Sequence, residues 1–191
     1  VLDTHSHADH VHGLDDLRMI FFNMRKRIDV WADQATQNDL IERFKYAFVQ
    51  PDDSPYPPIL NLNTLDGITE LYGDGGPINF VPFQVKHGNV NALGFRIGPL
   101  VYLPDVSEMS KEAWEEVKKA KCWILDALRR NPHPSHSHLE NSLEWIKISG
   151  IDKAILTNMH VDLDYETLIK ETPKNVEPAF DGMVLDFEFS I

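Results

Sequence analysis

The sequence predicts an α/β protein, because segments with helical periodicity alternate along the chain with short apolar segments of strand length. A predicted helix over residues 111–120, for example, lies between predicted strands over 100–103 and 122–126. The 191 residues are 42% hydrophobic, which is enough to bury a sizeable core. We therefore expect a single domain over residues 1–191.

Apolar residues spaced three and four positions apart predict the helices. The helix over 36–48 follows from Leu40, Ile41, Phe44 and Phe48. The same spacing predicts helices over 111–120, 139–148 and 165–171, and one after Ala8 that includes Leu14, Leu17 and Met19. Before the helix at 139, Ser137 and Glu140 have the spacing of a capping box, and Gly150 ends that helix.

Runs of β-branched, aromatic and other apolar residues predict the strands. They cover 28–31, 59–65, 78–86, 92–97, 100–103, 122–126, 153–157 and 182–189. Proline and glycine mark loops over 51–58 and 73–77.

The motif His5-Ser6-His7-Ala8-Asp9-His10 is the densest group of metal-ligating residues in the sequence. Neutral imidazole and carboxylate groups bind zinc, manganese and similar divalent ions. If the chain leaves a strand here, His5 and His7 point to one side, and a turn at Ala8 aims Asp9 and His10 elsewhere, which suits two adjacent ions. A histidine-rich surface turn is the simpler alternative, but this spacing favours a metal site.

This motif resembles that of the metallo-β-lactamase superfamily, in which a histidine, an aspartate and a second histidine follow at later strand ends. Residues 80–88, 99–105 and 154–160 are strand-like runs that contain or end in His87, Asp105 and His160. The resemblance implies that one ion binds His5, His7 and His87. It implies that a second binds Asp9, His10 and His160, with Asp105 bridging the two. Each of His87, Asp105 and His160, taken alone, would be an ordinary polar group at a strand end.

The resemblance also implies the αβ/βα sandwich of that superfamily. The superfamily places strands of its first sheet before the HxHxDH motif, whereas this sequence has four residues there. We therefore expect that the N-terminal strands are missing from the sequence given, since their loss would leave a sheet edge exposed.

Residues 129–138 resemble the HPxH segment of the phosphodiesterases related to the phosphoribosyl cyclic-phosphate phosphodiesterase. In that branch the histidine matching His136 approaches the substrate phosphate. Asp9 and His136 are thus the candidate catalytic residues, and His133, His136 and His138 the candidate substrate-binding residues. His136 could give a proton to the leaving group, or it could be an ordinary loop histidine. Asp126, at a strand end, could orient a ligand histidine.

Composition restricts the partners. The net charge of −12 disfavours long nucleic acids, and no apolar run approaches the ~20 residues of a membrane span. The single cysteine, Cys122, excludes an internal disulfide and fits a small buried hydrophobe. We expect a cytoplasmic protein, with a homodimer compatible with the sequence.

These observations predict a hydrolase with two divalent metal ions, zinc and manganese being the best candidates. A hydroxide bridging the ions would attack a small cyclic or nucleotide-like phosphodiester. The alternatives are a thioester or lactone hydrolase of the same superfamily, or a metal-binding module without catalysis.

Overall fold

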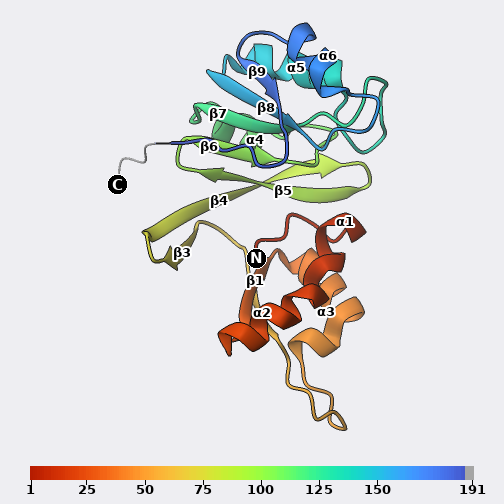
Figure 1. The fold of residues 1–191 in the computed structure, drawn as a ribbon, viewed down its shortest axis with the longest axis vertical. Helices are drawn as coiled ribbons and strands as arrows, with labels where there is room; N and C mark the ends of the chain where they lie inside the picture. Colours follow the sequence, from red (N-terminus) through yellow and green to blue (C-terminus); the bar gives the residue numbers. More distant parts are fainter. Residues whose placement is uncertain (188–191) are drawn as a thin grey trace. The chain divides into compact units, whose positions relative to one another are not determined.

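The computed structural model describes residues 1–187 and divides into two compact units, residues 1–67 and residues from 68 onward. We call them the N-terminal and the C-terminal unit and describe each by itself (Figure 1). The single-domain organisation of residues 1–191 stays a prediction.

The N-terminal unit contains two parallel strands that one long helix connects. Strands β1 (Ile28–Ala32) and β2 (Leu60–Thr64) pair in parallel, and α3 (Gln34–Phe48) connects them. Asp33 caps α3 by accepting a hydrogen bond from the Thr36 backbone NH at 2.8 Å. Leu2 extends the sheet through a parallel bridge to Trp31. The core of this unit comprises Val11, Leu14, Val30, Ala32, Leu40, Ala47, Phe48, Ile59 and Leu60.

Three short helices precede β1: α1 (Ala8–Val11), the 3₁₀ helix η1 (His12–Asp16) and α2 (Leu17–Met24). The sequence predicted one helix here, beginning after Ala8, and the structure confirms the start but divides the segment. Gly13 lies in η1, where its low helix propensity fits the interruption. Arg25, with φ of 51°, ends α2 in a left-handed conformation.

The C-terminal unit contains a seven-stranded sheet in the order β3-β4-β5-β6-β7-β8-β9. Its first four strands pair antiparallel, and β6 to β9 pair in parallel. The strands are β3 (Thr69–Gly73), β4 (Gly76–His87), β5 (Val90–Ile97), β6 (Leu100–Leu103), β7 (Cys122–Asp126), β8 (Lys153–Thr157) and β9 (Val176–Pro178).

Helices connect the parallel strands of this sheet: α4 (Lys111–Val117), α5 (Leu139–Ser149) and α6 (Tyr165–Glu171). Figure 1 shows α5 and α6 beside β8 and β9. Trp123, Leu125, Ala154 and Leu156 are completely buried in the middle of the sheet, and Cys122 is buried as predicted. A core centred on consecutive parallel strands holds their carboxyl ends in fixed positions.

Three sequence predictions are corrected. The predicted strand over 182–189 is absent from its described part, 182–187, where the chain turns at Gly182; residues 188–189 lie outside the described part. Strands β3 and β9 were not predicted. Helix α5 has His138, not Ser137, as its N-cap, because the Ser137 hydroxyl pairs with the Ser142 hydroxyl instead, at 2.6 Å.

Candidate metal centre

The candidate ligands of the C-terminal unit follow from strand direction. Strands β6, β7 and β8 are parallel, and β4 runs in the same direction because it is antiparallel to β5, which is antiparallel to β6. Their carboxyl ends therefore lie at one edge of the sheet. His87 ends β4, Asp105 follows β6 and Asp126 ends β7. Sheet topology thus gathers residues that are far apart in sequence.

His87, Asp105 and His136 form a group that could hold a metal ion, with ligand atoms all within 4.8 Å of one another. Asp105 Oδ2 lies 3.3 Å from His87 Nε2 and 3.9 Å from His136 Nε2. The side chains of His87 and Asp105 are 1% and 2% exposed, and that of His136 is 14% exposed. Two imidazoles and a carboxylate in a buried position are a donor set that fits a divalent cation.

Both histidines of this group are oriented through Nδ1. His87 Nδ1 donates to the Ser135 carbonyl oxygen at 2.6 Å, and His136 Nδ1 lies 2.9 Å from Asp126 Oδ2. A proton held on Nδ1 leaves Nε2 as the ligating or proton-exchanging atom. The sequence suggested that Asp126 orients a ligand histidine. In the structure its partner is His136, which is a predicted catalytic residue and not a predicted ligand.

Asp126 is itself held by the backbone. Its Oδ2 accepts from the NH groups of Val106, at 3.2 Å, and Ser137, at 3.3 Å. The side chain is completely buried, and burial raises its pKa to about 6, although its contacts with His136 oppose this rise. Asp126 therefore connects the end of β7 with the loops after β6 and before α5.

Two further residues shape this edge and were not found from the sequence. Gly88 has φ of +62°, and a Cβ there would lie 2.8 Å from Ser135 Cβ, so glycine lets His87 approach the Ser135 carbonyl. Asn158, with φ of +60°, donates to Asp105 Oδ1 at 3.4 Å and to the Pro104 carbonyl at 3.3 Å. The His-Gly pair at the end of a predicted strand was the available signal for Gly88.

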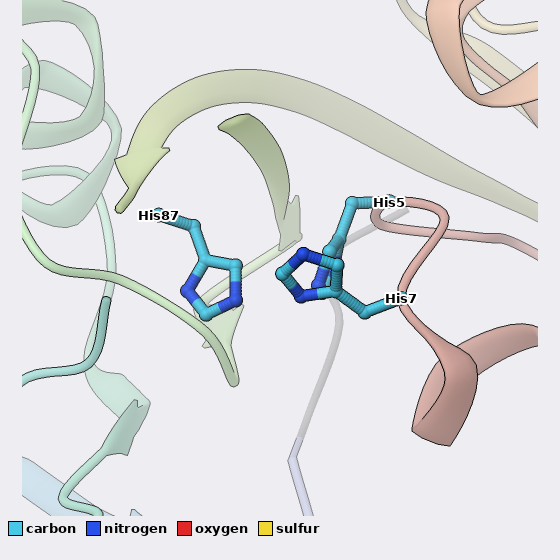
Figure 2. A group of neighbouring side chains, drawn as sticks. All are labelled: His5, His7 and His87. Carbon is cyan, nitrogen blue, oxygen red and sulfur yellow. The ribbon is translucent and has the colours of Figure 1, made fainter. Parts of the chain in front are cut away.

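In the N-terminal unit, His5, His7 and His10 gather at the start of α1. The ring centroid of His5 lies 4.5 Å from that of His7 and 4.3 Å from that of His10. Figure 2 shows the rings of His5 and His7 next to each other on the loop ahead of α1, and it also labels His87 of the C-terminal unit. The Thr4 hydroxyl contacts Nδ1 of His5 at 3.0 Å and of His10 at 3.2 Å. Nδ1 is thus engaged in both rings.

The remaining candidate residues are more exposed. Asp9 Oδ2 lies 3.6 Å from His10 Nε2, and the Asp9 side chain is 70% exposed. The His160 ring, 59% exposed, lies 3.4 Å from Asp162 and is outside the groups of neighbouring ligand atoms among the described residues. His133 lies beside His136, with ring centroids 5.2 Å apart, and burial lowers its pKa. His138 is half-buried and caps α5.

Comparison with known proteins identifies the family of this chain. A family model described as "Beta-lactamase superfamily domain" matches residues 1–160. The chain belongs to the metallo-β-lactamase superfamily. Its mixed α/β architecture is that of the superfamily: a crystal structure of a diphosphatase from the PhnP family matches with a TM-score of 0.86 and 31% identity, covering 98% of this chain and 71% of that one. The crystal structure of zinc-bound PqqB from Methylobacterium extorquens matches with a TM-score of 0.73 and 15% identity, over 98% of this chain and 72% of that one. At this identity the match shows the fold alone.

A curated relative carries a different name. A protein of Porphyromonas gingivalis named octanoyltransferase is 30% identical over 186 residues, which are 96% of this chain but 37% of that protein. The chain thus spans little more than a third of the relative's length. Membership in a superfamily of metal-dependent hydrolases, with a His/Asp group that could bind metal, is the functional statement that these findings support. Among the described residues, no helix has the length and apolarity needed to span a membrane.

Proposed function

We propose that this chain is a dinuclear metal-dependent phosphodiesterase that acts on a small cyclic or nucleotide-like phosphodiester. The observation that carries the proposal is the position of His136, fixed by Asp126 and placed 3.9 Å from the carboxylate of Asp105. A histidine held in this way can exchange a proton at Nε2 beside a metal-binding carboxylate, as hydrolysis of a phosphodiester requires.

The ligands are assigned as the sequence motif and the family imply. One ion would bind His5, His7 and His87, and the other Asp9, His10 and His160, with Asp105 shared. The donor chemistry supports this assignment, since His87 and Asp105 are adjacent in one unit and three imidazoles gather in the other. Two divalent ions, when bound, would neutralise charge on the phosphate oxygens and lower the pKa of water, with Zn or Mn suiting these donors.

His136 is proposed as the general acid. Asp126 holds Nδ1, which directs Nε2 toward the reacting group and stabilises the charged imidazolium. His133 and His138 are proposed as substrate contacts; His133 is adjacent to His136, whereas His138 begins the next helix. A location in the cytoplasm and a homodimer stay predictions.

The substrate class is tested by comparing three ester types with the same metal-loaded protein. We expect hydrolysis of bis(p-nitrophenyl) phosphate with two divalent ions bound per chain, and little turnover of a thioester or a lactone. Preference for either of the last two would favour the alternative hydrolases, and activity on none of them would favour a non-catalytic metal-binding module. Absence of bound transition metal from carefully purified protein would contradict the whole assignment.

The metal assignment is tested by removing one ligand at a time. Asp105→Ala should reduce binding of both ions because the carboxylate bridges them, whereas His87→Ala should empty mainly the first site. Elemental analysis distinguishes the two patterns. Equal loss in both variants, or loss in neither, would contradict the shared role of Asp105.

The role of His136 is tested with two leaving groups. His136→Ala should keep its metal content but lose roughly 10²–10⁴-fold in turnover of a substrate with a poor leaving group. Turnover of a nitrophenyl ester should change little, because nitrophenolate needs no proton. His12→Ala, which removes an exposed histidine of η1, is the matched control. Equal losses for both leaving groups would indicate phosphate binding instead of proton transfer.

A further inference from the structure

Ser6 lies between two candidate metal ligands, and its side chain is engaged elsewhere. The rings of His5 and His7 are adjacent, whereas the Ser6 hydroxyl donates to Asp39 Oδ2 on α3. His7 has extended backbone, with φ of −66° and ψ of 154°, and in such backbone successive side chains point to opposite sides. The side of the loop that carries no candidate ligand is therefore the side that contacts α3.

Arg43, one helical turn beyond Asp39, contacts the backbone of Ser6. Its Nη1 donates to the Ser6 carbonyl oxygen at 2.6 Å, and its Nη2 lies 3.6 Å from Asp39 Oδ2. The four-residue spacing places Asp39 and Arg43 on one face of α3, so a single helix face contacts both the hydroxyl and the carbonyl oxygen of Ser6. We call this set of contacts, made by Ser6, Asp39 and Arg43, the loop clamp.

The backbone of this loop is also held at its two ends. The structure assigns no strand to residues 3–7, and sheet pairing ends at the bridge between Leu2 and Trp31. At the other end, the His7 carbonyl accepts from the NH groups of His10 and Val11 at the start of α1. Between these points, α3 contacts the hydroxyl and the carbonyl oxygen of Ser6.

We propose that the loop clamp is a positioning device for metal binding: α3 holds Ser6 so that the rings of His5 and His7 converge on one ion. The inference rests on the proposed metal-dependent function, but it assigns roles to Asp39 and Arg43, neither of which is a candidate ligand. Their side chains are 42% and 43% exposed, and ion pairs so exposed contribute little to global stability. The effect of losing them should therefore appear in metal affinity more than in unfolding.

The test measures zinc affinity by competition with a chelator. Arg43→Gln and Ser6→Ala should each bind zinc about 10-fold more weakly than the wild type, as expected when a group that orients a ligand is lost. Arg43→Lys, which keeps a cationic donor, should recover part of the loss. Arg18→Gln is the matched control, because Arg18 belongs to the same unit and pairs at 2.7 Å with Asp15 instead of with Ser6.

A second readout uses metal-free protein. Hydrogen exchange of the His10 and Val11 amides, which donate to the His7 carbonyl, should be faster in Arg43→Gln than in the wild type and unchanged in Arg18→Gln. Wild-type affinity in both clamp variants, or an equal loss in Arg18→Gln, would overturn the inference. If the wild type itself binds no zinc, the proposed function fails, and the exchange rates alone decide whether the clamp orders the loop.

Discussion

The two units hold their candidate ligands by different means. In the C-terminal unit, His87 and Asp105 lie at the ends of strands in a seven-stranded sheet, and buried groups fix the histidine orientations. In the N-terminal unit, His5 and His7 lie on a loop that a half-exposed pair of side chains on α3 holds from one side. The first set thus lies at the ends of strands in a largely buried sheet, and the second on a loop whose contacts with α3 are polar and half-exposed.

The N-terminal unit also has the smaller core. Within residues 1–187, the C-terminal core contains 19 buried residues and the N-terminal core 9, and the sheet of the N-terminal unit has two strands. Helix α2 of the N-terminal unit has no buried residue, although most of its side chains are apolar. Polar contacts outside a core can place a ligand, but they leave it more sensitive to single substitutions. The difference predicts where mutations act on folding and where they act on geometry.

The largest expected effect at the candidate metal centre is the loss of the Asp126 carboxylate in the C-terminal unit. Asp126→Ala removes the acceptor for His136 Nδ1 and for the backbone NH groups of Val106 and Ser137. Unsatisfied buried donors are costly, so we expect a loss of about 3 kcal/mol in the free energy of unfolding. Urea denaturation of metal-free protein measures it. Asp126→Asn, which keeps an acceptor oxygen, should lose less; a loss below ~1 kcal/mol in the alanine variant would show that the edge is not held by this carboxylate.

A gain in stability, opposite in sign to the loss at Asp126, is expected from a substitution of Asp3 in the N-terminal unit. Its side chain is buried, and its Oδ2 has no hydrogen-bond partner among residues 1–187. Burial raises its pKa to about 6, opposed by the charge of His10. A carboxyl whose pKa is higher in the folded state binds more protons there, so stability falls as the pH rises from about 4 to 6 and is level above.

Asp3→Asn removes this ionisation. At pH 8 the metal-free variant should be more stable than the wild type by up to ~2 kcal/mol, with a smaller difference at pH 4. Denaturation midpoints at both pH values measure the effect. Parallel pH profiles for variant and wild type would mean that Asp3 is satisfied in the folded state.

A smaller effect is expected from adding one methyl group at a glycine in each unit. Gly88→Ala should lose about 1–2 kcal/mol, because φ is +62° and the new Cβ would meet Ser135 Cβ at 2.8 Å. Gly13→Ala is the matched change in the N-terminal unit, where no atom lies within 4 Å of the added Cβ. Its stability should be equal or slightly higher. Similar losses in both variants would contradict the close approach at Ser135.

The positions of several strands and the residues at their ends were accessible from the sequence, for a physical reason. Strands 100–103, 122–126 and 153–157 have the predicted bounds because their side chains are apolar on both faces of a covered sheet. Strand β3 was missed because it is polar and exposed, with Tyr72 78% exposed, and β9 because it is three residues long and ends in proline. The sequence over 182–189 includes alternating apolar and acidic residues. Such alternation does not by itself supply a neighbouring strand to pair with.

The site could be predicted where its residues are of types that commonly bind metal. The HxHxDH motif indicates His5, His7 and His10, and the resemblance to the superfamily indicates His87 and Asp105. The structure brings His87 and Asp105 together with His136. The residues that orient them carry no such mark. Ser135 acts through its carbonyl oxygen, and Asp39 and Arg43 are ordinary residues of a helix surface until the fold places Ser6 against them. Their contribution depends on tertiary contacts, which one sequence does not specify.

The smallest expected effect concerns the exposed apolar surface of α2. Met19 is 65% exposed, and glutamine has a similar length and helix propensity, so Met19→Gln should change the unfolding free energy by no more than about 0.5 kcal/mol. Ile146→Ala in α5 is the contrasting change, since that side chain is 3% exposed and its truncation should cost about 2–5 kcal/mol. Denaturation at two protein concentrations measures both. A loss above ~1 kcal/mol for Met19→Gln that grows with protein concentration would mean that a second copy covers α2, because association stabilises by mass action and exposed apolar side chains gain most from it.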